Sequence, residues 1–589
     1  MAQSLVLETA SGPHAATDPI TMEVIQNALV ALADEMAFTV ARTARSFVLK
    51  EALDYSTALF DAGGALVAQG TCLPLHLGAM PVAVEAVMRE FGNDVHPGDI
   101  FATNDPYDGS THLPDVVLVK PVFLGERLIG WSTVLAHQTD IGGRVAGGNA
   151  SDSTELYQEG LRIPPTRLYD RGEASHTLFR IIERNVRVPS LVLGDIRSQV
   201  AACSIGERGL IELAKRYGIE RFEAYCQALM DYAERFARAE IGKLAKGVYH
   251  FTDYLDGDGI VPGKITLQVA VEVLADRIRV DFAGTSPQVK GAINSVYAFT
   301  RSATLASVRS ILPLDLPNNA GYFRAVEVTV PEGTILNPRS PAPVAARGLT
   351  GFRIADTVMG ALAQIRPDLV PACGSNSPDA GVSIGGYHKD GTPFVYLEFL
   401  LASWGGGPNR DGADALTGMI INYSNTPAEL LETEQPLVVE RYAFVPDSGG
   451  AGRWRGGLAM DRHLRFTADE AIFQVRSDRR DIPPYGLAGG APGASSDVTI
   501  RRADGTEERH PAKFLTSVRK GDRLRIRLAG GGGYGKVAER EPARVLEDVL
   551  DGKVSLAAAD RDYGVIIRGT PPTVDAAATA ARRARTAQG

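Results

Sequence analysis

At 589 residues, the chain is much longer than a single hydrophobic core usually supports, so two to four domains are expected. Its 61 basic and 70 acidic side chains give a net charge of −9, which argues against a surface built for nucleic-acid phosphates. The four cysteines are widely separated and form no C-x-x-C pair, so neither a disulfide framework nor a structural zinc knuckle is indicated, and a reducing compartment is expected.

The apolar residues are distributed as in a globular protein. No uninterrupted apolar run approaches the length that spans a bilayer, and the N-terminus lacks the basic start and apolar stretch of a signal peptide. We therefore expect a soluble, cytoplasmic protein with no membrane and no nucleic acid among its partners.

The first 246 residues predict an α+β domain that ends in a helical layer. Asp18 and Pro19 are suited to the N-cap and first turn of a helix, and apolar residues then recur at helical spacing. Polar and glycine-rich turns separate the short apolar runs that follow, which is typical of hairpins. The expected elements are a helix over 18–46, a hairpin of strands 55–60 and 65–68, a helix over 80–91, a second hairpin of strands 115–123 and 128–135, and helices over 178–187 and 195–232.

The remaining residues predict two further domains and a flexible tail. Residues 247–400 alternate strands with helices, and residues 401–572 alternate glycine-rich turns with short strands, which indicates a β-rich module. Residues 573–589 have no large apolar side chain after Val574 and are expected to be a tail. The predicted fold class is multidomain α+β, with mixed and antiparallel sheets and packed helices. The expected elements are strands over 265–274, 278–282, 471–476 and 524–528 and helices over 298–310 and 351–364.

Three potential metal ligands flank the second hairpin. His112 and Asp115 lie at the start of its first strand, and His137 lies at the end of its second strand. If the turn centres near Gly125, Asp115 lies across from Ala136, with His137 beside it and His112 just beyond the strand end. Two imidazoles and a carboxylate at one end of a sheet suit zinc, manganese or ferrous iron.

Other roles are compatible with the same residues. A His and an Asp near strand ends often cap turns or satisfy backbone groups. The flanking segments 104–111 and 140–143 favour a functional site, because polar, glycine-rich loops at strand ends often carry catalytic groups. Asp54 opens the first hairpin and offers a second carboxylate, although it could instead cap a turn. His76 has apolar neighbours, so it suits a core histidine as well as a site residue.

A glycine-rich sequence near the C-terminus imitates a nucleotide-binding loop. Residues 530–536 (GGGGYGK) match the first seven positions of a P-loop and follow an expected strand. We do not predict nucleotide binding, because Val537 replaces the magnesium-binding hydroxyl and Pro542 interrupts the helix that would meet the phosphates. A turn packed against another chain, or a loop near the active site, is preferred. No G-x-S-x-G nucleophile elbow is predicted and no cysteine adjoins a histidine, so metal-assisted chemistry is favoured over a covalent nucleophile.

Several specific motifs occur in order along the chain. They are DYSTA at 54–58, HLG at 76–78, NDPY at 104–107, THLPD at 111–115, His137, DIGG at 140–143, DFAGTSP at 281–287, NTP at 425–427 and GGGYG at 531–535. In these motifs the chain closely resembles the hydantoinase B/5-oxoprolinase family, and only the segment after about Val574 lies outside the resemblance. The resemblance implies that the metal ligands are Asp54, His112, Asp115 and His137.

By this resemblance, the chain is the metal-dependent hydrolytic subunit of an ATP-dependent, ring-opening amidohydrolase. A hydantoinase A-like partner would bind ATP and phosphorylate a small cyclic amide, and the two subunits would form a hetero-oligomer. Asp105, Asp108, Asp140 or His76 could take the proton or orient the attacking water. Two alternatives remain open: a subunit similar to those of acetone and acetophenone carboxylases, which join a phosphorylated enol to carbon dioxide, and a non-catalytic scaffold for the ATPase partner.

Overall fold

An antiparallel sheet contains both hairpins predicted for the first part of the chain. In the computed structural model, which describes residues 17–375, 380–401 and 403–586, this sheet has seven strands in the order β2-β1-β5-β4-β3-β6-β7. Its two longest strands, β4 and β5, are buried along most of their length because helices cover the sheet. The strands are β1 (Tyr55–Asp61), β2 (Leu66–Gln69), β3 (Ile100–Thr103), β4 (Asp115–Leu124), β5 (Arg127–His137), β6 (Thr166–Asp170) and β7 (Glu173–Ala174).

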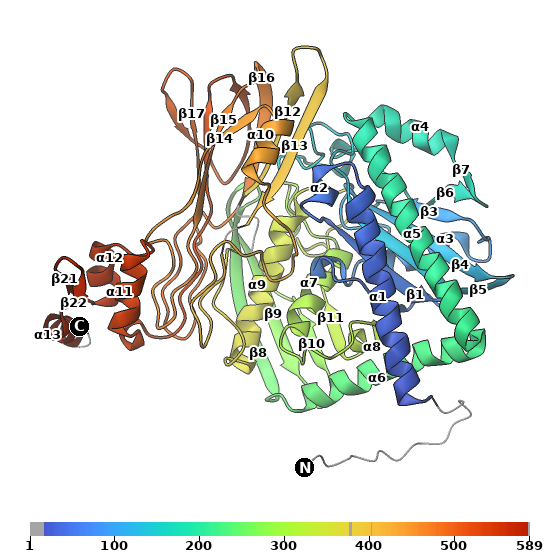
Figure 1. Ribbon diagram of the computed structural model, residues 1–589, viewed down its shortest axis with the longest axis horizontal. Coiled ribbons are helices and arrows are strands. Elements are labelled where there is room, and N and C mark those ends of the chain that lie inside the picture. The colour runs from blue at the N-terminus through green and yellow to red at the C-terminus, as the bar shows by residue number, and fades with distance from the viewer. Residues whose placement is uncertain (1–16, 376–379, 402, 587–589) are drawn as a thin grey trace.

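Helices α1 (Pro19–Thr43) and α5 (Pro189–Tyr217) pack on this sheet and on each other (Figure 1). The Asp18 carboxylate caps α1 by accepting a hydrogen bond from the Thr21 backbone N–H at 2.8 Å. The Gln199 amide on α5 donates to carbonyls of both β4 and β5, which fixes the helix over the central hairpin. The other helices of this part are α2 (Phe47–Lys50), α3 (Met80–Phe91), α4 (His176–Asn185) and α6 (Ile219–Gly242), with short 3-10 turns at Pro74–His76 and Leu156–Gln158.

Among the described residues, helix α1 is long and apolar enough to cross a membrane, although it contains no uninterrupted apolar run of that length. By length and composition it meets that criterion, with a mean hydropathy of 1.3 over its most apolar window. However, its apolar residues Ile25, Leu29, Met36 and Val40 recur on one face and are buried against the protein core. The composition therefore fits a core helix. The N-terminal residues used to assess a signal peptide lie outside the described residues.

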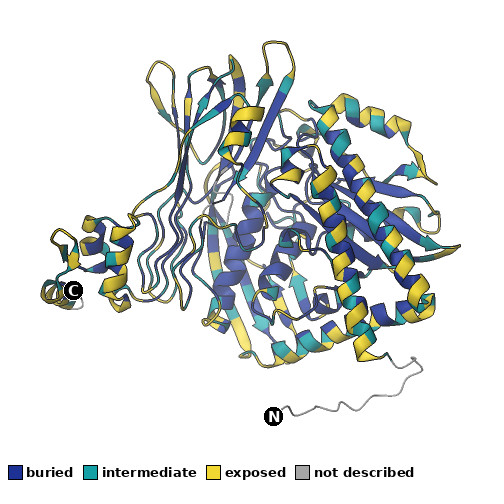
Figure 2. Cartoon of the chain, viewed as in Figure 1, coloured by how far each residue is buried: buried dark blue, intermediate teal, exposed yellow. Residues whose placement is uncertain are grey.

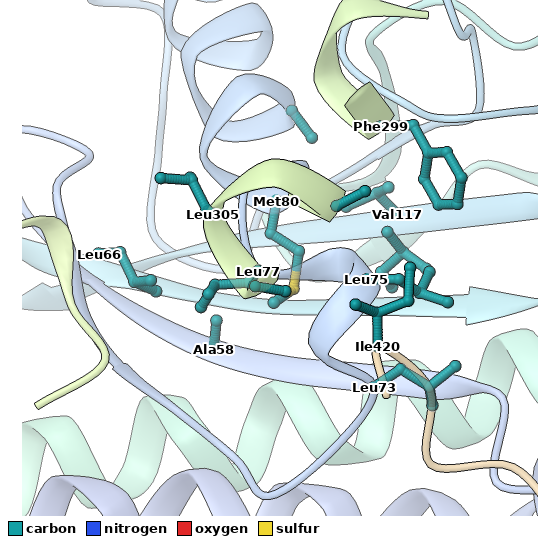
Figure 3. Close-up of a cluster of buried hydrophobic side chains, with 14 of the residues drawn as sticks. Ala58, Leu66, Leu73, Leu75, Leu77, Met80, Val117, Phe299, Leu305 and Ile420 are labelled. Atoms are coloured by element: carbon teal, nitrogen blue, oxygen red, sulfur yellow. The ribbon is translucent and has the colours of Figure 1, made fainter. Parts of the chain in front are cut away.

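A second sheet and three helices continue the same hydrophobic core. The sheet has the order β11-β10-β9-β8, and only its β10–β11 pair is parallel. Phe299 and Leu305 of α7 belong to the same buried apolar cluster as Leu77 and Met80 from the first part of the chain, and Figure 3 shows Leu305 beside Leu77 and Met80. The boundary expected at residue 246 therefore does not separate two cores. The elements are β8 (Gly247–Gly257), β9 (Pro262–Val273), β10 (Ile278–Asp281), β11 (Val326–Thr329), α7 (Tyr297–Arg309), α8 (Ala320–Phe323) and α9 (Arg347–Ile365).

The C-terminal part contains two antiparallel sheets around a second apolar cluster, with the orders β13-β12-β16-β19 and β14-β15-β20-β17-β18. The expected division at residue 400 falls inside this unit, because β12 and β13 precede it in the sequence, and β12 pairs with both β13 and β16. Helices and mostly antiparallel sheets thus confirm the predicted α+β class. The elements are β12 (Ala380–Tyr387), β13 (Pro393–Leu400), α10 (Ala428–Glu434), β14 (Leu437–Phe444), β15 (Met460–Phe466), β16 (Glu470–Ser477), β17 (Asp497–Arg501), β18 (Glu507–Arg509), β19 (Lys513–Arg519) and β20 (Arg523–Arg527).

The glycine clusters form extended segments that lie side by side, not the turns expected from the sequence. Segments 404–414, 449–457, 484–493 and 530–535 run between the β-sheets and the last helices and exchange backbone hydrogen bonds (Figure 1). A Cβ atom at Gly456 or Gly532 would lie 1.8 or 2.1 Å from a neighbouring backbone oxygen. Side chains are therefore excluded by the close approach of the backbones.

This packing also accounts for the P-loop-like sequence. Every backbone N–H from residue 530 to residue 535 donates to a carbonyl of a neighbouring segment, including Gly531 to Gly457 and Gly532 to Cys373. A phosphate-binding loop needs such N–H groups free to face its ligand. The glycines here serve chain packing within the same molecule.

The last described residues form a small helical unit with its own apolar cluster (Figure 1). Within the segment expected to be a flexible tail, α13 (Ala576–Thr586) packs through polar groups, because the buried Thr579 hydroxyl accepts from Ile566 N and Arg583 donates to three backbone carbonyls. The lack of large apolar side chains in this segment therefore led to the wrong expectation that it would not pack against the rest of the chain. The other elements are a 3-10 turn at Val537–Glu539, α11 (Pro542–Leu550), α12 (Leu556–Tyr563), β21 (Ile567–Arg568) and β22 (Thr573–Val574).

Candidate metal centre

A β-bulge in the second hairpin determines which face its ligands share. The turn is where the sequence predicts it, with Leu124 paired to Arg127, but the register shifts by one residue at Ile129. Asp115 therefore pairs with His137 and not with Ala136 as expected. Side chains directly across an antiparallel pair lie on the same face, whereas the expected register would have turned His137 to the opposite face. The bulge thus makes the metal site possible.

His112, Asp115 and His137 form a buried cluster. One potential ligand atom from each lies within 4.8 Å of the others, and all three side chains are almost completely buried. The His112 Nε2 atom is 3.4 Å from Asp115 Oδ1, and the two imidazole ring centres are 4.9 Å apart. Figure 2 shows this central part of the molecule as largely buried.

The orientation of His112 is fixed through its other ring nitrogen. Its Nδ1 lies 2.9 Å from the Ala345 carbonyl, which can only accept, so Nδ1 donates and Nε2 keeps a lone pair. The Glu159 carboxylate accepts from the N–H groups of Val344 and Ala345 at 2.8 and 2.9 Å and so holds that carbonyl in place. Such support of a ligand's remote nitrogen is characteristic of metal-binding histidines.

Asp115 is held as a carboxylate with one oxygen available. Its Oδ2 accepts hydrogen bonds from the Thr111 hydroxyl and from Arg347 Nη2, the latter at 2.6 Å, while Oδ1 has no hydrogen-bond partner. Burial by itself raises the pKa of this carboxyl, but the charge of Arg347 and the neighbouring His112 outweigh burial and hold the pKa well below its usual range. Asp115 is therefore ionised at neutral pH.

The unsatisfied atoms of the cluster match the needs of a divalent metal. His112 Nε2, both ring nitrogens of His137 and Asp115 Oδ1 are buried without hydrogen-bond partners among the described residues. Burial lowers the pKa of His112 and brings that of His137 well below its usual range, so both rings are neutral. Buried polar atoms are rarely left unpaired, and neutral imidazoles with one carboxylate are suitable ligands for zinc, manganese or iron. The donor set thus fits the metal predicted from the sequence.

Asp54 adjoins this cluster. It immediately precedes β1, and its carbonyl accepts a hydrogen bond from the His137 N–H at 3.0 Å. Burial, followed by repulsion from Asp115, raises the pKa of the Asp54 carboxyl to about 8. The group is therefore largely protonated at neutral pH without a metal. Its position beside His137 and Asp115 is compatible with the predicted role of fourth ligand, which stays a prediction.

His76 lies against the same cluster and is completely buried. Its Nε2 is 4.0 Å from Asp115 Oδ2 and has no hydrogen-bond partner among the described residues. The Ser56 hydroxyl lies 2.9 Å from His76 Nδ1 and 3.4 Å from the Leu73 carbonyl oxygen. Burial lowers the pKa of His76 to about 4. His76 therefore lies beside the cluster, and its role as a site residue stays a prediction.

The three other carboxylates predicted as catalytic candidates do not join this cluster. Asp105 is paired with Arg162 at 2.6 Å, and Asp108 pairs with Arg89 at the surface. Asp140 is buried and accepts hydrogen bonds from backbone N–H groups and from the Arg187 guanidinium. Each of these groups organises a loop through its own partners, so their proposed role in proton transfer gains no support from the geometry.

Sequence reasoning missed the residues contributed by distant segments. Arg347, at the start of α9, stacks over Phe299 and pairs with Asp115. Phe399 of β13 packs against His137 in a T-shaped arrangement with ring centroids 5.9 Å apart, and Arg476 of β16 lies over Phe399. An arginine or a phenylalanine in a strand carries no motif that marks a site, so only the fold reveals them.

Two cavities are lined by residues near the cluster. A cavity of about 10 Å³ is lined by Arg347, Phe399, Arg476 and Gly381, among others. A larger cavity, of about 320 Å³, is lined by Thr139, two residues after His137, together with apolar residues of β13 and α10. The larger cavity is of a size that accommodates a small organic molecule.

The chain belongs to the hydantoinase B/oxoprolinase family, whose model matches residues 18–537. It is 35% identical over 569 residues to a protein of Pseudomonas sp. strain NS671 whose name assigns it to a D-/L-hydantoinase, covering 93% of this chain and 95% of that one. It is likewise 35% identical over 585 residues to the β subunit of the caprolactamase of Pseudomonas jessenii, covering 96% of this chain and 99% of that one. The family expected from the motifs is thereby confirmed.

Two solved structures share the fold. A chain of the ATP-dependent caprolactamase from Pseudomonas jessenii superposes with a TM-score of 0.91 at 34% identity and covers 97% of this chain and 100% of its own length. The nucleotide-free acetone carboxylase superposes with the same TM-score of 0.91 at 20% identity, covering 97% of this chain and 83% of the other. At that lower identity the second match shows the fold alone.

Proposed function

We propose that this chain is the metal-dependent hydrolytic subunit of an ATP-dependent enzyme that opens a cyclic amide. The observation that carries the proposal is the convergence of unpartnered buried atoms of His112, Asp115 and His137 on one point. The names of two relatives, a hydantoinase subunit and a caprolactamase subunit, support a cyclic amide as the substrate class.

The chemistry explains why two subunits would be needed. An amide nitrogen donates electrons into its carbonyl, which resists attack by water, whereas phosphorylation of the oxygen removes this stabilisation and creates a leaving group. We assign that phosphorylation to an ATP-binding partner, since the P-loop-like segment of this chain has its N–H groups committed to neighbouring backbone.

Residues of this chain would supply the hydrolytic step. His112, His137, Asp115 and Asp54 would hold a divalent metal, which when bound lowers the pKa of a coordinated water and stabilises oxyanion charge. Arg347 and Thr111 keep Asp115 ionised and oriented, and the unpartnered Nε2 of His76 offers a proton acceptor beside it.

The test is to co-purify the chain with its genomic neighbour and to assay hydantoins, 5-oxoproline, lactams and ketones with ATP. We expect ring opening by the wild type, at least 100-fold slower turnover for His112→Ala and His137→Ala, and unchanged partner association by gel filtration. Full turnover by either variant would contradict the metal role.

Two further measurements distinguish the alternatives. Carboxylated product formed only with bicarbonate would identify a carboxylase, for which the acetone carboxylase match supplies only the shared fold. A purified chain without bound metal, whose histidine variants support full activity of the complex, would indicate a scaffold. We expect no ATP hydrolysis by the chain alone, and Lys536→Ala serves as the control for that result.

A further inference from the structure

Arg476 is a buried arginine without an acidic partner. Five arginines are among the largest fully buried side chains of the described residues. Four of them form ion pairs within 3.0 Å, namely Arg353 with Asp356, Arg462 with Glu398, Arg479 with Asp356 and Arg540 with Asp548. Arg476 has no ion pair among the described residues. Its Nη1 donates to the Asn149 carbonyl at 2.9 Å, and its Nη2 is buried with no hydrogen-bond partner.

The surroundings leave space for this guanidinium. A Cβ atom at Gly381, which pairs with Arg476 in the sheet, would lie 2.9 Å from both Nε and Nη2 of the arginine. The guanidinium also lies over the Phe399 ring at 5.3 Å, and that ring packs against the His137 ring in a T-shaped arrangement. One aromatic side chain, that of Phe399, therefore lies between Arg476 and the cluster of His112, Asp115 and His137.

The cavity beside Arg476 is small and positively charged. Arg347 and Arg476 both line its volume of about 10 Å³, which is enough for about one water-sized atom. Asp115 neutralises Arg347, whereas nothing described neutralises Arg476. The Tyr423 hydroxyl is also buried without a partner, and its ring lies 5.8 Å from Phe399. Burying a charge and hydrogen-bonding groups without partners is costly, and an arriving anion would offset that cost.

We propose that Arg476 is an oxyanion-recognition residue beside the candidate metal centre and receives one negatively charged oxygen of a bound anion. This inference rests on the proposed function, because it identifies the ligand as the phosphoryl group of an activated substrate or as carbonate. Both anions present oxygens that suit a guanidinium, and the unpartnered Nη2 of Arg476 is a charged donor that favours an anionic oxygen over a neutral ligand.

The experiment is isothermal titration of the zinc-loaded full chain with inorganic phosphate and, separately, with bicarbonate. We expect the wild type to bind at least one of them, and Arg476→Met to bind that anion about 10- to 100-fold more weakly. Arg519→Met removes an exposed arginine from the neighbouring strand β19 and should leave binding unchanged. Preference for phosphate would indicate the activated substrate, and preference for bicarbonate would indicate carbonate.

Thermal unfolding distinguishes ligand recognition from a structural role. Removing an uncompensated buried charge should leave the melting temperature of anion-free Arg476→Met equal to or above that of the wild type, and the anion should raise the melting temperature of the wild type alone. A lower melting temperature with unchanged anion affinity would assign Arg476 to structure and overturn the inference. If the methionine variant does not fold, Arg476→Lys replaces it, with binding about 10-fold weaker than in the wild type expected.

These outcomes are separable from the fate of the proposed function. Anion binding that depends on Arg476 in a complex without ring-opening activity would leave this inference standing and refute the proposed hydrolysis. If Arg476→Met bound the anion with wild-type affinity while its complex opened rings normally, this inference would be refuted and the proposed hydrolysis would stand.

Discussion

Metal binding at pH 7 should release close to one proton from Asp54. Burial and the neighbouring Asp115 raise the pKa of this carboxyl to about 8, so it is mostly protonated at pH 7 in the metal-free chain. A carboxylate must be ionised to bind a metal, whereas His112 and His137 are already neutral because their pKa values are lowered. With a pKa of about 8, roughly nine-tenths of a proton leaves per metal at pH 7, and roughly one-tenth leaves at pH 9.

The assay is calorimetric titration of the metal-free chain with zinc in buffers of different ionisation enthalpy. The slope of the apparent enthalpy against the buffer enthalpy counts the protons released. Asp54→Asn should abolish most of this release and weaken metal binding, which separates the carboxyl from a proton lost by metal-bound water. Equal release by the wild type and Asp54→Asn would refute both the raised pKa and the ligand role.

Three further predictions address the support of the site and of the fold. Thr111→Val removes a hydrogen bond to Asp115 and should weaken zinc binding about 10- to 100-fold in a chelator competition. Thr111→Ser retains the hydrogen bond and should retain the affinity, and equal affinities of the two variants would argue that Thr111 does not support Asp115. The metal-free chain should lose stability to urea as the pH falls from about 6.5 to about 4, because His76 binds a proton in the unfolded chain but stays neutral in the folded one. His76→Asn should flatten this dependence, and the same slope of unfolding free energy against pH in the variant and the wild type would contradict the prediction. Gly532→Ala places a Cβ 2.1 Å from a backbone oxygen and should cost about 3 kcal/mol or more of unfolding free energy, whereas Gly242→Ala in a helix should be neutral or slightly stabilising; similar values would count against close backbone packing.

The sequence alone predicted the local elements of the first part of the chain well. The helix over 80–91 has the bounds expected from its apolar spacing, and the opening helix begins at the residue that follows its predicted N-cap. These elements depend on interactions between residues a few positions apart, which periodicity and capping record directly. The family was also predicted, because its motifs are short continuous sequences.

The glycine clusters show where local interpretation failed. A glycine indicates that a Cβ atom is not tolerated, but the sequence does not say whether a turn or a neighbouring backbone excludes it. Gly456 and Gly532 belong to the second case, since their neighbours come from segments far away in the sequence. Because the sequence does not distinguish these two cases, the closely packed glycines of residues 530–535 also match the pattern of a P-loop.

For the metal centre, the sequence by itself determined which residues can act as ligands, because His112, Asp115 and His137 flank one hairpin. The tertiary structure decided that they share a face, since a single extra residue at Ile129 reverses the direction of every side chain beyond it. It also decided their charge states, because burial and the ion pair with Arg347 depend on segments brought together only by folding.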